Sequence, residues 1–319
     1  MTGPAAGPAK IAVVGAGSVG ATLAYACLIN GVARTIAIYD VNPVKARAET
    51  LDLNHGLQFV PMATVVGSDD VEVCRDADLV VVTAGAKQKP GQTRLELAAA
   101  NVALCKELVP RLLEVAPDAV LLLVTNPVDV VTYAALRYSG LPPRRVLGSG
   151  TVLDSSRLRL LVARHCGVAV QNVHAYIAGE HGDSEIPLWS SASIGSIPLL
   201  GWAVPGRPPL DEAARAEIVR QVVGAAEEII RGKGATNYAV GLAASRIIEA
   251  VLRDQHQVLP VSSLLDGVDG IGDVCLSLPS VVDRGGVETV LPVPLSPEEA
   301  AGLRRSADTV RGVIRSLGL

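Results

Sequence analysis

One histidine, His181, lies between glycines and carboxylates in the stretch 178–183, which reads Ala-Gly-Glu-His-Gly-Asp. Imidazole is the side chain that gives and takes protons near neutral pH. A second stretch, 154–157, reads Asp-Ser-Ser-Arg. An aspartate can orient an imidazole and favour its charged form, and an arginine can hold a carboxylate through two parallel hydrogen bonds. These residue types suit acid–base chemistry on a small hydroxy or keto acid, although a lone histidine in a glycine-rich turn is more often structural.

The composition is that of a globular protein with a large core. The chain has 319 residues, of which 49% are hydrophobic and 19% charged, and its formal net charge is -4. This length allows two domains or one large one, and the low charged share favours an oligomer. A slightly acidic chain lacks the excess of positive charge that binds nucleic acid or an anionic membrane. No apolar run approaches the ~18 residues of a membrane span.

The N-terminus and the cysteines indicate a cytoplasmic protein. Residues 1–9 are rich in glycine, proline and alanine without a long apolar stretch, which predicts a flexible tail rather than a signal peptide. The five cysteines are scattered and form no C-x-x-C pair. That spacing argues against a disulfide framework or a zinc site, so we expect buried, reduced thiols and no bound metal.

The first half begins with a predicted dinucleotide-binding element. The apolar run 11–14 is typical of a buried parallel strand, and it leads into G-x-G-x-x-G at 15–20 and a predicted helix at 21–30. The helix start would offer free N–H groups and a positive dipole end to phosphates. The residues of this turn that we expect to contact the cofactor are Gly15, Gly17, Ser18, Val19 and Gly20.

Each glycine of the turn has a separate task in such an element. Gly15 allows the tight bend, Gly17 lets the backbone approach a pyrophosphate, and Gly20 lets the helix pack closely against the strand. The next apolar run, 35–39, ends at Asp40, which can accept hydrogen bonds from the adenosine ribose. No arginine lies beside Asp40 in the sequence to bind a 2′-phosphate. The pattern therefore favours NAD over NADP.

Strands and helices alternate through the remainder of the first half. We predict strands at 35–39, 78–83, 119–124 and 145–147 and helices at 94–114 and 128–139. This alternation is typical of an α/β fold with a doubly wound parallel sheet, here a Rossmann domain spanning 10–150. Ligands bind such sheets at the carboxyl ends of the strands, from which the loops 84–92 and 126–129 leave.

The pattern changes after about residue 150. We predict helices at 154–166, 210–231 and 236–254, strands at 173–177, 258–263, 274–278 and 287–293, and a last helix capped by Ser296. This half is therefore expected to be an α+β substrate or catalytic domain spanning 151–319, which carries His181.

Six motifs occur in one order along the chain: GAGSVG, AKQKPGQTRLEL, TNPVDV, SGTVLDSSRLR, IAGEHGDSE and GKGATNYAVGLA. In these motifs the chain resembles the lactate/malate dehydrogenase family, from residue 10 to the C-terminus. The resemblance implies an NAD-dependent oxidoreductase that transfers a hydride between NADH and a small 2-keto acid.

The resemblance also implies roles for individual residues. His181 would donate a proton to the keto oxygen of pyruvate and, in reverse, remove the hydroxyl proton of lactate, with Asp154 orienting it. Arg157 would clamp the substrate carboxylate. Arg94, which follows a polar loop that could close over the site, would polarise the carbonyl as negative charge develops.

Two further residues complete the implied pocket. Asn126 would form hydrogen bonds near the reacting oxygen and the cofactor, and Thr236 would lie beside the methyl group of the substrate. Taken singly, Arg94 could be a solvated charge, Asn126 a turn residue and Asp154 a helix cap. Their motifs, however, occur in the order found in the family, which favours the catalytic interpretation. An alternative of another class is a non-catalytic NAD-binding redox sensor, which should lack part of this proton relay.

The choice between lactate and malate depends on Gln88. Members of the family that use malate characteristically carry arginine at this loop position, because the second carboxylate of their substrate needs a cation. Gln88 supplies a neutral amide, and the flanking lysines at 87 and 89 are expected to be solvated. An uncompensated charge would cost several kcal/mol, so we expect pyruvate and L-lactate rather than oxaloacetate and malate.

Regulation and assembly are expected from the resemblance alone. Many bacterial members are activated by fructose 1,6-bisphosphate, whose phosphates meet an arginine and a histidine at positions held here by Arg159 and His174. Both side chains can bind phosphate. The resemblance also implies a homotetramer, in which the effector lies across a subunit interface.

Overall fold

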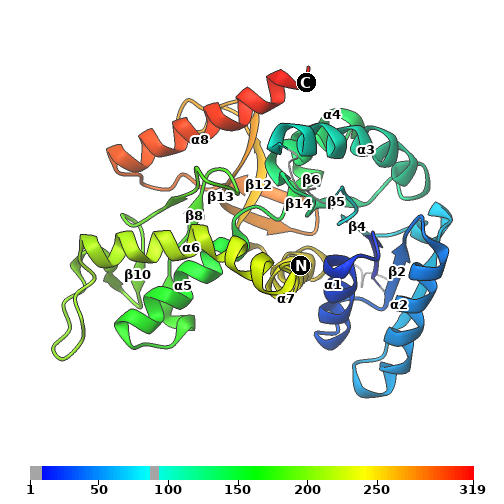
Figure 1. Ribbon diagram of the computed structural model, residues 1–319, viewed down its shortest axis with the longest axis horizontal. Coiled ribbons are helices and arrows are strands. Elements are labelled where there is room, and N and C mark those ends of the chain that lie inside the picture. Colours follow the sequence, from blue (N-terminus) through cyan, green and yellow to red (C-terminus); the bar gives the residue numbers. More distant parts are fainter. Residues whose placement is uncertain (1–8, 87–92) are drawn as a thin grey trace, which may run out of the picture.

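The computed structural model describes residues 9–86 and 93–319. Residues 1–8 of the expected tail, and Gln88, lie outside the described residues. A nine-stranded sheet with the order β14-β13-β12-β6-β5-β4-β1-β2-β3 runs through the molecule (Figure 1). Its strands are β1 Lys10–Val14, β2 Thr35–Tyr39, β3 Thr64–Ser68, β4 Leu79–Val82, β5 Val120–Leu123, β6 Val146–Gly148, β12 Gln257–Leu265, β13 Val274–Asp283 and β14 Gly286–Val290.

The first six strands are parallel, in the order β3-β2-β1-β4-β5-β6. Their apolar runs are buried on both faces, as the sequences LVVV of β4 and VLLL of β5 illustrate. Alternate residues of β1 enter two separate cores: Ile11 and Val13 pack on one face of the sheet, Ala12 and Val14 on the other. The predicted doubly wound sheet is therefore confirmed.

Helices cover both faces of this sheet. The α-helices of the described residues are α1 Ser18–Ile29, α2 Pro43–His55, α3 Arg94–Val115, α4 Val128–Ser139, α5 Val152–Cys166, α6 Glu212–Lys233, α7 Tyr238–Leu252 and α8 Pro297–Ser316. Side chains of α1 and α7 belong to one core, and side chains of α3 and α4 to the other, which agrees with their positions on opposite sides of the sheet in Figure 1. The last helix begins with the predicted capping box between Ser296 and Glu299.

The sheet does not stop at the expected domain boundary near residue 150. Strand β12 pairs antiparallel with β6 at Ser262 and Gly148, and β13 and β14 follow it outward. Gly148 permits this approach, because a Cβ atom there would lie 2.4 Å from Thr132 Oγ1 and 3.0 Å from Ser262 Cβ. Strands of the second half thus extend the nucleotide-binding sheet.

Several elements differ from the sequence expectation. Helix α2 and strand β3 had not been predicted. The single strand expected at 173–177 is two short strands, β7 Val173–His174 and β8 Ile177–Ala178, because β7 pairs with β10 Ser193–Ile194 whereas β8 pairs with β9 Ile186–Pro187. Strand β14 ends at Val290, shortly before Pro292, which has no N–H to donate to a ladder.

The five cysteines are buried and unpaired, as predicted. Within the described ranges, we find no helix whose length and apolar character would allow it to cross a bilayer.

Candidate active site and cofactor cleft

The glycine turn after β1 is built as its spacing predicts. Gly15 has φ +104°, a conformation that side-chain-bearing residues rarely adopt. A Cβ atom at Gly20 would lie 1.9 Å from Gly15 O, so only glycine lets α1 pack this closely. At Gly17 a Cβ would meet nothing within 4 Å, so the backbone there faces open space. Helix α1 begins at Ser18 and directs its first N–H groups into the same space.

A cavity of about 1,020 Å³ lies against this turn at the carboxyl ends of the parallel strands. Its size and its open, amide-lined floor fit a dinucleotide. The predicted residues that line it are Gly15, Gly17, Ser18, Val19, Asp40, Asn126 and Thr236. The carboxylate of Asp40 is held at the cavity wall, where Oδ2 accepts a hydrogen bond from Ala16 N at 2.7 Å. Lys45, which had not been predicted, also lines this wall.

The predicted proton-transfer residues converge on one carboxylate. Asp154 Oδ2 lies 2.6 Å from His181 Nδ1, and Arg157 Nη1 donates to Asp154 Oδ1 at 2.8 Å. Only 2% of the Asp154 side chain is exposed, against 24% for His181. Because Nδ1 faces Asp154, the imidazole presents Nε2 for a proton that moves to or from a ligand.

The surroundings of His181 favour its charged form. Burial disfavours the imidazolium, but the charge and the hydrogen bond of Asp154 outweigh it and raise the pKa of His181 to about 9. The carboxylates of Asp129 and Glu185 act in the same direction. Burial also works against the Asp154 carboxylate, yet the charges of His181 and Arg157 hold its pKa below the usual value.

A second buried aspartate, Asp129, binds the backbone of His181. It lies in the first turn of α4, where Oδ2 accepts a hydrogen bond from His181 N at 2.8 Å and Oδ1 accepts one from Ser262 Oγ at 2.6 Å. Burial raises the pKa of Asp129 to about 6, although both hydrogen bonds oppose the rise. Its only sequence signal was an acid among the apolar residues of TNPVDV, and a role had not been predicted for it.

Arg94 is the first residue of α3 and reaches the histidine loop. Its Nη1 donates to Asp183 Oδ2 at 2.6 Å, two residues after His181, and both side chains are largely exposed. The structure thus brings Arg94 to the edge of the predicted site, in contact with Asp183.

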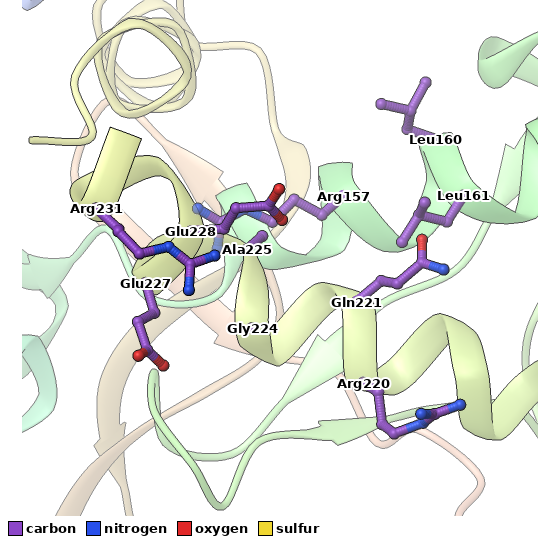
Figure 2. Close-up of a pocket in the computed structure, with 10 residues that line it drawn as sticks. All are labelled: Arg157, Leu160, Leu161, Arg220, Gln221, Gly224, Ala225, Glu227, Glu228 and Arg231. Atoms are coloured by element: carbon purple, nitrogen blue, oxygen red, sulfur yellow. The ribbon is translucent and has the colours of Figure 1, made fainter. Parts of the chain in front are cut away.

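Arg157 lines a pocket of about 530 Å³ between α5 and α6. Figure 2 shows this pocket, with Arg157 and Leu161 from α5 and Gln221 and Ala225 among the residues from α6. The Arg157 side chain is only 15% exposed, and its hydrogen bond to Asp154, three residues earlier on α5, holds the guanidinium in place. An arginine held in this way can bind a carboxylate ligand next to the histidine.

Asn126 joins the cofactor cavity to the histidine loop. Its carbonyl accepts a hydrogen bond from Asn101 Nδ2 at 2.7 Å, while Asn101 Oδ1 accepts one from Ala86 N. Three residues later, Asp129 holds His181. The start of α4 therefore positions both the exposed amide of Asn126 and the loop that carries His181.

The two residues predicted to bind an effector lie away from this cleft, close to one another in the fold. Arg159 Nε donates to Ala175 O at 2.8 Å, and the guanidinium lies 4.7 Å from the centre of the Tyr176 ring. His174, the residue before Ala175, is exposed on β7.

The site therefore combines a dinucleotide cleft, an imidazole held by a buried carboxylate and a half-buried arginine. These groups suit proton and hydride exchange with a small carboxylic acid. Glu185 also reaches this site, although it had not been predicted and no motif singles it out.

Comparisons with known proteins agree with this arrangement. Residues 9–148 match the family model of the lactate/malate dehydrogenase NAD-binding domain, and residues 151–317 match that of the alpha/beta C-terminal domain. The chain is similar to the L-lactate dehydrogenase of Bifidobacterium animalis subsp. lactis (strain AD011), with 54% identity over 312 residues and 98% of each chain covered.

Solved structures agree as well. The crystal structure of MGS-M5, a lactate dehydrogenase from a Medee basin deep-sea metagenome library, matches with a TM-score of 0.94 and 38% identity, covering 98% of this chain and 99% of that one. The minor L-lactate dehydrogenase from Enterococcus mundtii matches with a TM-score of 0.93 and 38% identity, covering 97% and 98%. On its sequence, fold and site, the chain belongs to the lactate/malate dehydrogenase family and is an NAD-dependent oxidoreductase.

Proposed function

We propose that the chain is an L-lactate dehydrogenase, which catalyses reversible hydride transfer between NADH and pyruvate. The observation that carries the proposal is the carboxylate of Asp154, one oxygen of which holds His181 while the other holds Arg157. A proton donor and a carboxylate binder are thereby held side by side by the same group, as the chemistry of a 2-keto acid requires. The relatives named L-lactate dehydrogenase support the same activity.

Bound NADH supplies the hydride from the cleft beside the glycine turn. Protonated His181 donates its Nε2 proton to the keto oxygen as the alcohol forms, and neutral His181 accepts the hydroxyl proton of lactate in the reverse direction. The negative charge of Asp154 stabilises the imidazolium and keeps Nδ1 protonated. Asp129 holds the backbone of the histidine, so the ring stays in one place.

The remaining residues bind and polarise the substrate. Arg157 binds the carboxylate of pyruvate, because burying that charge without a partner would cost several kcal/mol. Arg94 exchanges Asp183 for the carbonyl oxygen when substrate is present, and its cation stabilises the developing negative charge. Asn126 and Thr236 both line the cofactor cleft. There Asn126 would hydrogen-bond near the same oxygen, and Thr236 would lie beside the methyl group.

We infer pyruvate rather than oxaloacetate from Gln88, which lies outside the described residues. Steady-state oxidation of NADH, followed at 340 nm with pyruvate and with oxaloacetate, tests the proposal. A higher kcat/KM with pyruvate is expected. A preference for oxaloacetate would identify a malate dehydrogenase, and NADH binding without turnover of either acid would favour a redox sensor.

We also propose that the enzyme works as a homo-oligomer, as a tetramer in its complete form. Support comes from an apolar surface over α1 and α7, two helices joined by a 2.8 Å hydrogen bond from Asn237 Nδ2 to Thr22 Oγ1. Exposed large side chains gather there: Tyr25 and Ile29 on α1, and Tyr238 and Leu242 on α7. Large apolar side chains exposed on two neighbouring helices are typical of interaction sites. Size-exclusion chromatography with light scattering tests the assembly.

Fructose 1,6-bisphosphate is proposed as an activator of this assembly. Arg159 and His174 support the proposal, because the Arg159 bond to Ala175 holds the guanidinium beside the exposed histidine. That bond engages Nε rather than the terminal amino groups, which are the nitrogens that suit a phosphate. A bisphosphate would bridge cationic groups that otherwise repel each other and so favour the assembled form.

A further inference from the structure

A histidine and two carboxylates lie together at the edge of the large sheet, outside the site described above. One potential metal-binding atom from each of His256, Asp283 and Glu288 lies within 4.8 Å of the other two. His256 Nδ1 is 2.9 Å from Glu288 Oε2. The sequence argument against a zinc site concerned the spacing of the cysteines, and no cysteine belongs to this cluster.

Three neighbouring strands place these side chains in one row. The pairing of β12 with β13, continued by one residue beyond the start of β12, places His256 opposite Asp283. The register between β13 and β14 shifts by one residue, which leaves Glu288 as an extra residue on the edge strand β14. A bulge of this kind changes the direction of a side chain. Strand pairing therefore sets the positions of all three groups.

The surroundings of His256 favour positive charge. Its hydrogen bond to Glu288 raises the pKa of His256, and the charges of three carboxylates add to the rise, although desolvation opposes it. These carboxylates are Asp254, Asp283 and Glu288. Arg144 binds both oxygens of Asp283. In the described part of the chain, Asp254 and Glu288 pair with His256 and with no lysine or arginine. Carboxylates therefore outnumber the cations at this cluster.

Two further arginines in this corner of the molecule have other partners. Arg253 Nη1 pairs with Glu249 Oε1 at 2.5 Å, and Arg284 Nη2 donates to Leu252 O at 3.1 Å. Arg284, which directly follows the aspartate of the cluster, also lines a cavity with Asp78, the residue before β4. The cluster therefore lies toward the amino ends of the parallel strands, away from the cofactor cleft at their carboxyl ends.

We propose that His256, Asp283 and Glu288 bind a divalent transition-metal ion, with zinc as the best match. One imidazole and two carboxylates suit zinc, whereas magnesium and calcium prefer oxygen ligands alone. Zinc–ligand distances of about 2.0–2.2 Å require the three atoms to draw closer together. His256 and Glu288 are free to make this adjustment, since 55% and 46% of their side chains are exposed. A bound ion would fasten the edge strand β14 to the turn before β12.

Isothermal titration calorimetry with zinc chloride tests the site in the wild type, His256→Asn, Glu288→Gln and His55→Asn. His256 has φ +48°, a conformation that asparagine tolerates, so this substitution removes the imidazole without backbone strain. His256→Asn and Glu288→Gln should each weaken zinc binding at least ~10-fold, because losing a ligand costs at least as much as losing a group that orients one. His55→Asn, at an exposed position on α2, should bind zinc as the wild type does.

Zinc should also stabilise the fold, because the three ligands come together only when the strands are paired. At ten times the dissociation constant, zinc should raise the melting temperature of the wild type by about 2 °C and that of His256→Asn by much less. The rate of NADH oxidation with pyruvate, measured without zinc, should be the same in both proteins, because the cluster lies away from the active site.

Two results would overturn the proposal: no zinc binding by the wild type at millimolar concentration, and equal zinc affinity in the wild type and His256→Asn. Equal affinity would arise if zinc bound instead at Asp154, His181 and Glu185, which also lie within 4.8 Å of one another, and such binding would inhibit NADH oxidation. A wild type that binds zinc through His256 but does not oxidise NADH with pyruvate would refute the proposed function and leave this site in place.

Discussion

The backbone N–H of His181 donates to the carboxylate of Asp129, with 2.8 Å between N and Oδ2, although 52 residues separate the two in the chain. The same carboxylate accepts a hydrogen bond from Ser262 on β12. Asp129 thus connects α4, the histidine loop and a strand of the C-terminal half. The position of the His181 imidazole depends on this connection as well as on Asp154.

Replacing Asp129 should change both stability and the pH profile. Asp129→Ala leaves two buried donors without acceptors and should lower the free energy of unfolding by about 2–4 kcal/mol, measured by urea denaturation. Asp129→Asn keeps an acceptor but removes a charge that raises the pKa of His181. Pyruvate reduction needs protonated His181, so kcat/KM should fall as pH rises through about 9 in the wild type and at lower pH in Asp129→Asn.

Ser262→Ala is the matched control for this pair of variants. It removes one hydrogen bond and keeps the charge of Asp129, so the alkaline limb should stay where the wild type has it. An unchanged alkaline limb in Asp129→Asn would show that this charge does not influence His181.

Removing the imidazole should abolish most turnover. His181→Ala should lower kcat at least ~100-fold, because general acid–base catalysis typically contributes that much. NADH binding, followed by fluorescence, should survive, since the glycine turn and Asp40 lie elsewhere. His55→Ala, at an exposed position on α2, serves as the control. Loss of NADH binding together with turnover would indicate that His181 is structural.

Arg94 should matter for catalysis and hardly at all for stability. Its pair with Asp183 is exposed, at 76% and 68% of the two side chains, and such pairs contribute less than about 1 kcal/mol. Arg94→Gln should therefore leave the melting temperature almost unchanged while kcat falls about 100-fold. Arg75→Gln, which removes another exposed pair, should affect neither quantity. An Arg94→Gln enzyme with normal kcat would exclude Arg94 from carbonyl polarisation.

Gln88 should decide between the two substrates. Gln88→Arg introduces a cation that pairs with the second carboxylate of oxaloacetate and stays unpaired with pyruvate. The ratio of kcat/KM for the two acids should shift by ~100-fold or more, as about 2.7 kcal/mol of differential binding would produce. Gln255→Arg, at an exposed position elsewhere, should leave the ratio as it was. The same ratio in both variants would mean that Gln88 does not face the substrate.

The effector prediction concerns Arg159. At sub-saturating pyruvate, fructose 1,6-bisphosphate should lower the apparent KM of the wild type, and Arg159→Gln should weaken this response. Arg164→Gln, an exposed arginine on the same helix, is the comparison. Wild-type kinetics indifferent to millimolar effector at both acidic and neutral pH would refute the idea.

The sequence by itself determined the local elements and the chemistry they carry. The buried strand, glycine turn, helix and Asp40 at 11–40 follow from short-range patterns, and the structure has them at the predicted places. The capping box at Ser296 is equally local. His181, Asp154 and Arg157 could be selected because their residue types and motifs narrow the chemistry before any contact is known. Helix α2 escaped prediction because only one of its residues is buried, so it has no apolar periodicity.

The tertiary structure alone decided which groups share a site. Asp129 reaches Ser262 across 133 residues, and nothing in the local pattern of either residue indicates that contact. Glu185 acquires its altered proton affinity from burial and from Asp154, which are properties of the packed site rather than of the peptide. The extension of the sheet by β12 likewise depends on Gly148 admitting a strand from the second half. Periodicity reports interactions within a few residues, whereas burial and the field of distant charges exist only after the chain has folded.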